Sequence, residues 1–431
     1  MTTAILITFI IGYICIVAEH PLRVDKAATA LVMGVLCWTF YTLGLADVHD
    51  AEQSLLHHIE EIAGILLFLM GAMTVVEVLD AHEGFRVITD RIHTTKKVRL
   101  MWLLGFFAFF LSAVLDNLTT TIVMVSLCRK LVDDQKTRWF YAGIIVIAAN
   151  AGGAWSPIGD VTTTMLWIGG QLTTIPLIKE LLLPSIINLV VPLAVLSFLL
   201  KGNVQRPASN SDQQTEVTRR ERLVVFLVGI GGLLFVPVFK SITHLPPFMG
   251  MMLSLGIIWI ITELLHGRKM HEERSRFSAL SALRKIDMPS VLFFLGILLA
   301  VAALSEAGYL LQLSAVLKEQ MGNVYAINIS IGFLSAVIDN VPLVAASMGM
   351  YEIAPGITND AWSNLFVSDG VFWHFLAYTA GTGGSMLIIG SAAGVAAMGI
   401  EKIPFMWYLK KISLWALVGY LAGAAIYIVL H

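Results

Sequence analysis

The sequence predicts an all-α polytopic membrane protein of two inverted repeats, each with about five transmembrane helices, a re-entrant hairpin and a discontinuous helix. Its 431 residues are 57% hydrophobic and only 13% charged, a composition far from that of a soluble domain. Stretches of roughly 20 apolar residues, enough to cross a hydrocarbon core as helix, recur along nearly the whole chain. A seven-residue motif also occurs once in each half, which indicates a duplication.

Twelve apolar segments are expected, six before and six after a polar stretch at 201–221. That stretch is rich in Asn, Gln and Ser, which is typical of an exposed linker between a first repeat at 1–200 and a second at 222–431. The first segment begins without a basic stretch before it, which argues against a cleaved signal peptide. The segments fall at about 4–18, 27–45, 60–79, 100–133, 139–170, 176–200, 222–239, 247–266, 288–304, 324–352, 371–400 and 406–430.

The repeated motif is the most informative feature of the chain. Leu111–Asn117 (LSAVLDN) and Leu334–Asn340 (LSAVIDN) are identical at six of seven positions and lie 223 residues apart. A Gly-rich marker follows each motif, at Ala149–Gly153 and at Ala380–Gly384. Because the markers keep the same order in both halves, the two halves are expected to share one architecture.

The segments that carry the motifs, 100–133 and 324–352, each have a polar break in the middle, so that a through-span or a hairpin would fit locally. Lys and Arg gather in cytoplasmic loops. Basic loops flank 100–133 on both sides, whereas the loop after 324–352 is acidic and poor in Lys and Arg. The first hairpin should therefore enter from the cytoplasm and the second from outside, and an odd number of spans per repeat makes the repeats inverted.

The same count of spans orients the rest of the chain. Both termini and the loop at 46–59 are expected outside, and the linker at 201–221 is expected in the cytoplasm. The Gly-rich markers should break the spans at 139–170 and 371–400. Since unpaired backbone groups at membrane depth need protein or water as partners, the hairpin tips and helix breaks should line a common site near the midplane.

Asp116 and Asp339 lie at the two predicted hairpin tips. A carboxylate at the bilayer centre costs at least about 2.5 kcal/mol, so each needs a partner, a proton or a cation. Burial favours the protonated form and a bound cation favours the ionised form, so a proton and a metal ion compete for each aspartate. The neighbours Asn117 and Asn340 offer amide oxygens, which suit Na+, although both are equally well explained as compatible helix caps.

Further oxygen-bearing residues surround the tips and breaks. Glycine pairs alone could serve close helix packing, but packing needs no carboxylate, so Asp160 favours a binding site. Its counterpart in the second repeat is Ser391, and therefore the first site should be richer in ligands and hold a cation more tightly. The additional candidates are Thr119 and Thr120 after the first tip, Ser156 and Asp160 in the first break, and Thr382 and Ser385 in the second.

Other ionisable residues are weaker candidates. Acidic side chains near span ends can reach water by snorkelling, and histidines in loops or interfaces are more often solvated than pH-sensing. These residues are Glu77, Glu263, Glu306, His57, His58 and His374.

Several functional classes are disfavoured. The net charge of −2 offers no basic patch for nucleic acid, and the three cysteines lack metal or disulfide spacing. An intramembrane aspartyl protease also uses two aspartates, but it would need a Gly-x-Gly-Asp setting that neither Asp116 nor Asp160 has. The repeat symmetry has no place in that chemistry. We therefore expect neither an enzyme nor a cofactor.

Three stretches, Ser112–Thr121, Gly152–Thr164 and Asp339–Pro342, resemble the NhaD-type sodium/proton antiporters of the ion transporter superfamily. The resemblance spans nearly the whole chain. It implies opposed re-entrant hairpins and exchange of Na+ or Li+ for H+ by alternating access. It also implies a homodimer in the cell inner membrane.

One alternative keeps the fold and changes the substrate. Dicarboxylate-carrying relatives have a Ser-Asn-Thr motif at both tips, where this chain has Asp116 and Asp339. Two unit charges 4 Å apart interact by about 4 kcal/mol at an effective dielectric of 20, so the aspartates should repel an anion. The Asp-Asn signature is also similar to arsenite-type and pigment-cell permeases, which leaves an ion-coupled transporter of a neutral or anionic solute as the alternative.

Overall fold

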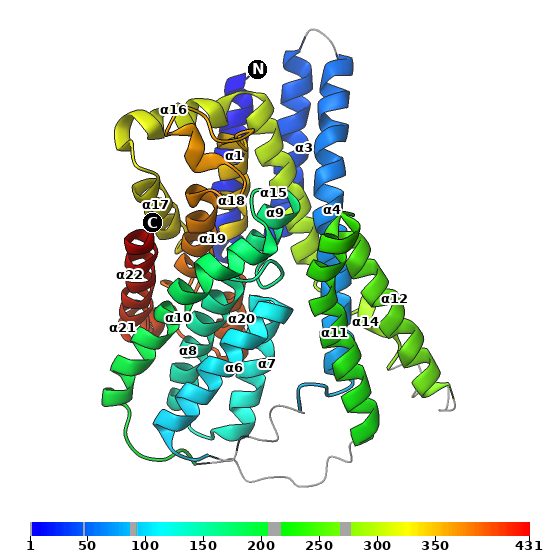
Figure 1. Ribbon diagram of the computed structural model, residues 1–431, viewed down its shortest axis with the longest axis vertical. Helices are drawn as coiled ribbons and strands as arrows, with labels where there is room; N and C mark the ends of the chain where they lie inside the picture. The colour runs from blue at the N-terminus through cyan, green and yellow to red at the C-terminus, as the bar shows by residue number, and fades with distance from the viewer. Residues whose placement is uncertain (1, 46–47, 87–91, 93, 206–216, 268–276) are drawn as a thin grey trace.

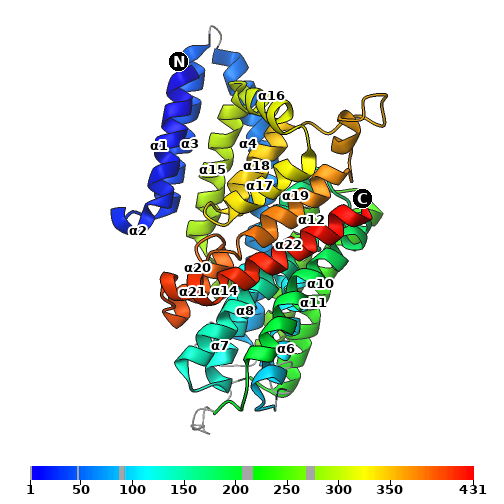
Figure 2. The same ribbon diagram turned by 90° about the vertical axis from the view of Figure 1, so that its left-hand side faces the viewer.

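The computed structural model describes residues 2–45, 48–86, 92, 94–205, 217–267 and 277–431. Every regular element in these ranges is a helix (Figures 1 and 2). Eight of the described helices are long and apolar enough to cross a membrane. The prediction of an all-α polytopic membrane protein is therefore confirmed, while the inverted relation of its two halves stays a prediction. Most of the predicted linker, 206–216, lies outside the described residues.

Three helices of the first half begin after a capping aspartate. Asp25, Asp134 and Asp160 each precede a helix and accept a hydrogen bond from its first turn, which satisfies a backbone N–H group that has no partner in the helix. The helices are α1 (Thr2–Val17), α2 (Glu19–Leu22), α3 (Lys26–Gly44), α4 (Val48–Ala81), α6 (Lys97–Leu115), α7 (Asn117–Leu131), α8 (Gln135–Ala154), α9 (Val161–Ile168) and α10 (Thr174–Leu199).

The second half follows the same logic. Thr218 and Glu221 form a reciprocal capping box at the start of its first helix. The elements are α11 (Arg219–Thr243), α12 (Pro247–His266), α14 (Ala279–Leu283), α15 (Met288–Glu306), α16 (Tyr309–Met321), α17 (Val324–Ser335), α18 (Asn340–Met350), the 3-10 helix η1 (Ser363–Phe366), α19 (Val371–Gly383), α20 (Ala392–Glu401), α21 (Phe405–Lys411) and α22 (Ser413–Leu430).

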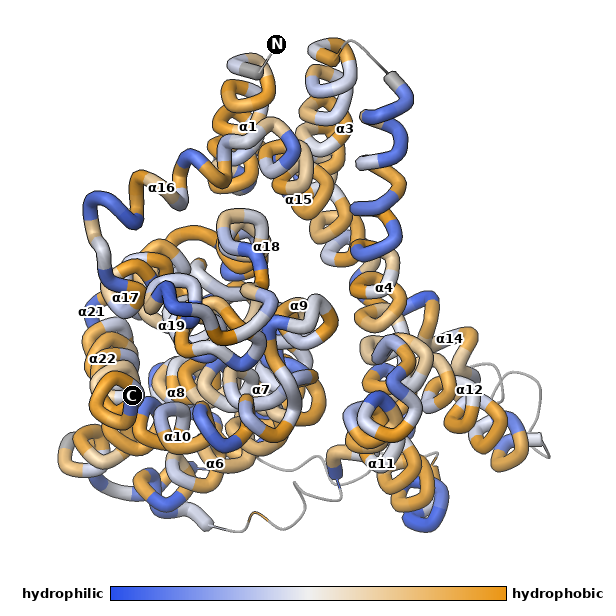
Figure 3. Tube along the Cα trace, turned by 45° about the horizontal axis from the view of Figure 1, so that its top comes forward, coloured by the Kyte–Doolittle hydropathy of each residue, from blue (hydrophilic) through white to orange (hydrophobic). Residues whose placement is uncertain are grey.

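The expected outer loop at 46–59 is wrong over its described residues, because α4 is one helix of 34 residues from Val48. At 1.5 Å per residue such a helix is about 51 Å long, against a hydrocarbon core of about 30 Å. Its first turns are hydrophilic (Figure 3), and Glu, Gln and His are tolerated in a helix that extends beyond the apolar layer. The helix therefore continues past the span that hydropathy alone delimits.

Two further boundaries differ from those expected. The stretch between the spans at 288–304 and 324–352 contains the helix α16, whose described residues bury only Leu310. The last span, expected at 406–430, is divided into α21 and α22 at Ile412. Lys410 and Lys411 lie in the last turn of α21, where positive charge stabilises a helix C-terminus.

The two Asp-Asn motifs lie where helices break. Asp116 alone separates α6 from α7, and residues 336–339 separate α17 from α18. In both views α6 and α7 lie toward one end of the long axis and α17 and α18 toward the other (Figures 1 and 2). Two more interruptions, at 155–160 and 384–391, separate α8 from α9 and α19 from α20.

Glycines let the broken helices closely approach the helices that precede the Asp-Asn motifs. A Cβ atom on Gly152 of α8 would meet the carbonyl oxygen of Phe109 in α6. A Cβ atom on Gly383 of α19 would likewise meet the carbonyl oxygen of Gly332 in α17. Both helices thus pack backbone against backbone, which only glycine allows.

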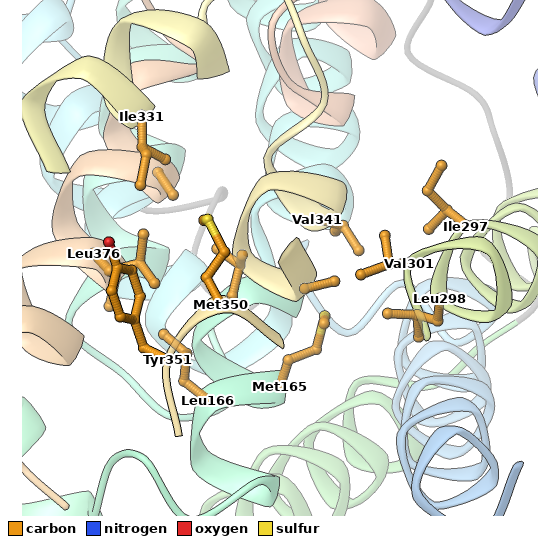
Figure 4. Close-up of a cluster of buried hydrophobic side chains, with 14 of the residues drawn as sticks. Met165, Leu166, Ile297, Leu298, Val301, Ile331, Val341, Met350, Tyr351 and Leu376 are labelled. Atoms are coloured by element: carbon orange, nitrogen blue, oxygen red, sulfur yellow. The ribbon is translucent and has the colours of Figure 1, made fainter. Parts of the chain in front are cut away.

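The helices form two groups beside each other. In Figure 3, α1, α3, α15, α4, α12 and α11 make a row beside a second group that contains α6, α7, α8, α9, α17, α18 and α19. Apolar side chains join the groups: Val301 of α15, Val341 of α18 and Met165 of α9 belong to one buried cluster (Figure 4). Val341 lies one residue after Asn340, so this cluster holds the start of α18 against α15.

Candidate ion-binding site

Asp160 is the carboxylate at which the two hairpin tips meet. It precedes α9 and accepts a hydrogen bond from the backbone N–H of Thr162 at 3.2 Å. Asn117 Nδ2 lies 3.2 Å from Asp160 Oδ2, and Asn340 Nδ2 lies 3.2 Å from the same oxygen. Asp160 is only 2% exposed. One buried carboxylate therefore accepts an amide N–H from each half of the chain.

Asn117 and Asn340 therefore both use their amide nitrogens to bind Asp160. Asn117 Nδ2 also donates to Asn150 Oδ1 at 3.1 Å. Asn150 Nδ2 in turn donates to Ser385 Oγ at 2.9 Å and to Ser391 Oγ at 3.0 Å. A chain of side-chain amides thus links the first tip to the second helix break. Ligation of Na+ by the asparagine oxygens stays a prediction.

Asp116 holds an unusual backbone conformation at the first tip. Its φ of 117° and ψ of 162° lie in a region that side chains other than glycine rarely adopt, at a cost of roughly 1–3 kcal/mol. The side chain accepts hydrogen bonds from the backbone N–H of Thr119 at 2.7 Å and from Thr119 Oγ1 at 2.8 Å. The first tip is therefore strained and its carboxylate is bound locally.

Asp339 is held differently at the second tip. Its φ of −50° and ψ of 138° are ordinary, and its side chain accepts a hydrogen bond from the backbone N–H of Val341 at 3.2 Å. The ammonium group of Lys26 lies 3.6 Å from Asp339 Oδ2. The second carboxylate thus has a fixed cation beside it.

A small cavity of about 50 Å³ joins these groups. Its lining includes all five charged or amide residues of the two tips and the first break, namely Asp116, Asn117, Asp160, Asp339 and Asn340, together with Lys26. Pockets that bury small organic ligands typically measure roughly 300–1,000 Å³. The space between the tips is therefore sized for an ion.

Two larger cavities lie on either side of the small one. A cavity of about 670 Å³ shares Met73 and Leu118 with it and is lined further out by Glu77 and Lys130. A second, of about 590 Å³, is lined by His58 and other residues and shares no described lining residue with the small cavity. In this conformation the small cavity therefore adjoins the cavity of about 670 Å³ and not the one of about 590 Å³.

The remaining sequence candidates lie at varying distance from this centre. Thr119 lines the 670 Å³ cavity, and Ser385 reaches the tips only through Asn150. Three others do not line the small cavity. Ser156 Oγ donates to Ala113 O at 2.5 Å, and Thr382 Oγ1 donates to Tyr378 O at 2.6 Å. Thr120 is buried, and its hydroxyl has no hydrogen-bond partner among the described residues.

The weaker candidates also lie away from the tips. Glu77 is 3.4 Å from Lys285 Nζ, and His58 Nε2 is 3.0 Å from Glu306 Oε1 across α4 and α15. His374 is buried, with Nε2 3.7 Å from Asp369 Oδ1. Of these residues and His57 and Glu263, none lines the small cavity within the described part of the chain.

Sequence reasoning missed two residues at the centre, Lys26 and Asn150. Asn150 stands inside the Gly-rich marker after the first motif, and an amide in an otherwise apolar segment is a usable signal. Lys26 stands at the start of an apolar segment, where a lysine is commonly solvated. Only the fold brings it to Asp339.

The residues at the centre have the chemistry that a cation site requires. Three carboxylates and one ammonium group surround a cavity too small for an organic ligand, and hard cations prefer such oxygen ligands. Interrupted helices at membrane depth are the usual setting for coupled-ion sites in transporters. A chain with these features belongs to the class of secondary ion transporters.

Comparison with known proteins narrows that class. Residues 13–368 match the citrate transporter family. Sodium/proton antiporter 1 of Arabidopsis thaliana is 48% identical over 99% of this chain and 72% of its own length. The Na+/H+ antiporter NhaD of Alkalimonas amylolytica is 32% identical over 98% of this chain and 89% of its own length. The NhaD antiporter of Vibrio cholerae is 31% identical over 99% and 91%. The chain therefore belongs to the citrate transporter family and, by these relatives, to the NhaD-type sodium/proton antiporters.

Proposed function

We propose that this protein exchanges Na+ for H+ across a membrane by alternating access. The observation that carries the proposal is the convergence of Asp116, Asp160 and Asp339 on one cavity of about 50 Å³. The names of the relatives support the same exchange. A carboxylate at membrane depth needs a proton or a cation as partner, so Na+ binding displaces protons and protonation releases Na+.

The cavities on either side of the site support a path for the ions. In the conformation described, Na+ enters through the 670 Å³ cavity and passes Met73 and Leu118 to reach the carboxylates. Exchange then requires a second conformation in which that route closes and the 590 Å³ cavity on the other side reaches the site. Protons enter from the side of the 590 Å³ cavity and move in the direction opposite to Na+.

Asp160 has a different role from the two tip aspartates. Since Asn117 and Asn340 both donate to it, Asp160 ties the tips together. When Na+ binds or leaves, a change at this carboxylate reaches both halves at once. Asp116 supplies the second carboxylate for Na+, and Thr119 orients it through two hydrogen bonds.

The proposal extends to the setting in the cell. The basic loops beside α6 and α7 favour the cytoplasm for that side, and therefore the 670 Å³ cavity faces inward and both termini lie outside. We place the protein as a homodimer in the cell inner membrane, where exporting Na+ or Li+ against incoming H+ serves pH homeostasis.

Transport of citrate or another carboxylate is the competing function, suggested by the name of the matching family. The site disfavours it, because three carboxylates repel an anion and the cavity between them is far below the roughly 300 Å³ of a small-ligand pocket. A neutral solute such as arsenite escapes the charge argument, but it leaves Asp116 and Asp160 without a cation, since only Asp339 has one in Lys26 among the described residues.

The experiment uses purified protein in liposomes with a pH-sensitive dye. After a pH gradient is imposed, addition of Na+ or Li+ should dissipate it with saturable kinetics, whereas choline should not. Radiolabelled citrate and arsenite are tested in the same vesicles. Saturable solute uptake without Na+-dependent proton movement would reject the antiporter and favour the solute transporter.

A further inference from the structure

Lys26 brings a fixed positive charge to the site, and the exchange described above does not use it. The side chain starts from the first residue of α3, where Asp25 accepts a hydrogen bond from the backbone N–H of Ala27 at 2.7 Å and fixes the helix start. Its ammonium nitrogen lies 3.6 Å from Asp339 Oδ2 and 4.5 Å from the centroid of the Phe293 ring. Two independent contacts, one ionic and one with an aromatic face, therefore hold the charge in place.

The first tip has no equivalent group. Within the described ranges no Lys, Arg or His forms an ion pair with Asp116, whose side chain instead binds Thr119. Asp160 likewise accepts hydrogen bonds only from neutral donors, Asn117, Asn340 and Thr162. Of the three carboxylates, only Asp339 forms an ion pair with a cationic side chain of the described part of the chain.

An ammonium group and a Na+ ion carry the same charge and seek the same carboxylate oxygens. While Lys26 occupies Asp339, a second cation there would be repelled by the ammonium group. A cation bound between Asp116 and Asp160 meets two carboxylates with no competing charge on them. Asp116 and Asp160 are therefore available to a transported cation, whereas Asp339 is already paired with Lys26.

We propose that Lys26 is the resident counterion of Asp339, and that this pairing restricts the transported Na+ to Asp116 and Asp160. This inference rests on the proposed exchange function and names which of its carboxylates bind the ion. Lys26 is a positioning residue: it acts through Asp339 and sets how many cations the site accepts. A merely structural ion pair would anchor α3 to α18 without affecting Na+ affinity.

The test measures the apparent KM for Na+ of Lys26→Arg, Lys26→Met, Asp339→Asn and the double variant Lys26→Met/Asp339→Asn in liposomes. Asp339→Asn leaves the ammonium group of Lys26 without its carboxylate, next to the Na+ bound at Asp116 and Asp160. The KM for Na+ of this variant should therefore rise at least tenfold. Removing that charge in the double variant should bring the KM back to within threefold of the wild-type value. Lys26→Arg, which keeps the charge, should stay within twofold.

Lys26→Met alone removes the ammonium group and leaves the negative charge of Asp339 uncompensated near the Na+ bound at Asp116 and Asp160. Its KM for Na+ should fall at least threefold. Equilibrium binding of radiolabelled Na+ to the purified variants gives a second readout that does not require transport, and size-exclusion chromatography checks that each variant is folded.

The outcomes separate the two proposals. A double variant as impaired as Asp339→Asn would overturn the role of Lys26, because Asp339 would then bind Na+ itself. An unchanged KM in Lys26→Met would overturn it as well and leave a structural ion pair. If the wild-type protein showed no Na+-dependent proton movement at all, the exchange function itself would be wrong.

Discussion

The tip between α6 and α7 and the tip between α17 and α18 carry the same Asp-Asn pair but hold it differently. At the first tip Asp116 has a strained backbone and binds Thr119. At the second tip Asp339 has an ordinary backbone and lies beside Lys26. The two asparagines, by contrast, do the same thing, since both donate to Asp160.

This comparison shows what a duplicated motif preserves and what it leaves free. The helix break and the amide that reaches the centre are common to both halves. The partner of each carboxylate comes from outside the motif, from the next turn of helix at Asp116 and from a distant helix at Asp339. Two similar aspartates can therefore serve one site in different roles.

Replacing the shared carboxylate should have the largest effect. Asp160→Asn removes a charge and leaves one acceptor oxygen for two amide donors, so exchange should fall by roughly 100-fold or more, as when a buried group that stabilises charge is lost. The rate is measured as Na+-dependent dissipation of a pH gradient. Ser391→Ala, at the corresponding position of the second half, is the control and should lose far less. Comparable losses of exchange in the two variants would contradict the central role of Asp160 as the carboxylate that both asparagines bind.

The second-largest effect is expected from glycines that allow the broken helices to pack closely. Gly152→Ala and Gly383→Ala each push a methyl group against a backbone carbonyl, which should destabilise the protein by about 1–3 kcal/mol. Gly256→Ala in α12, where a Cβ atom has open space, is the matched control. Thermal unfolding of purified protein measures all three. If only one of the first two variants is destabilised, the packing of the two halves is not equivalent.

A moderate effect is expected from replacing Asn117 or Asn340, and the two variants should differ in their KM for Na+. Asn117→Ala loses hydrogen bonds to both Asp160 and Asn150, whereas Asn340→Ala loses only its contact with Asp160. A hydrogen bond to a charged group is worth about 1.5–3 kcal/mol, so the KM for Na+ should rise by roughly tenfold or more in Asn117→Ala and less in Asn340→Ala. A larger effect at Asn340 would reverse the ranking of the tips.

The smallest effect is expected at Thr382. Its hydroxyl donates to Tyr378 O within its own helix and does not line the small cavity, so Thr382→Ala should change the KM by about twofold or less. Thr119→Val is the matched comparison from the first tip, because that hydroxyl binds Asp116 directly. A Thr382 variant as impaired as the Thr119 variant would place Thr382 among the ligands after all.

Much of the fold follows from local signals in the sequence. Apolar runs of span length, capping aspartates and Gly-rich markers each act within a few residues, so the spans and the residues of the helix breaks could be predicted. The start of α4 at Val48 could not, because a polar stretch continues a helix outside the bilayer without any apolar signal. The short helix α16 was not predicted either, because its apolar residues alternate with Gln, Ser, Lys and Glu and form no run of span length.

The site was predictable only in part. Asp116, Asn117, Asp160, Asp339 and Asn340 stand out because ionisable and amide groups are costly in apolar segments. Their pairing is a property of the tertiary structure: Asn117 and Asn340 lie 223 residues apart and converge on Asp160. Lys26 is 313 positions before Asp339 (339 − 26), and no pattern in the sequence links them.

The inequality of the two tips is tested most directly by the apparent KM for Na+ of Asp116→Asn beside that of Lys26→Met/Asp339→Asn. Each variant has lost one tip carboxylate, and the second has also lost the ammonium group paired with it. We expect at least a tenfold rise in KM for Asp116→Asn and a value within threefold of wild type for the double variant. Equal rises in the two variants would contradict the account, because both tips would then bind the transported ion alike.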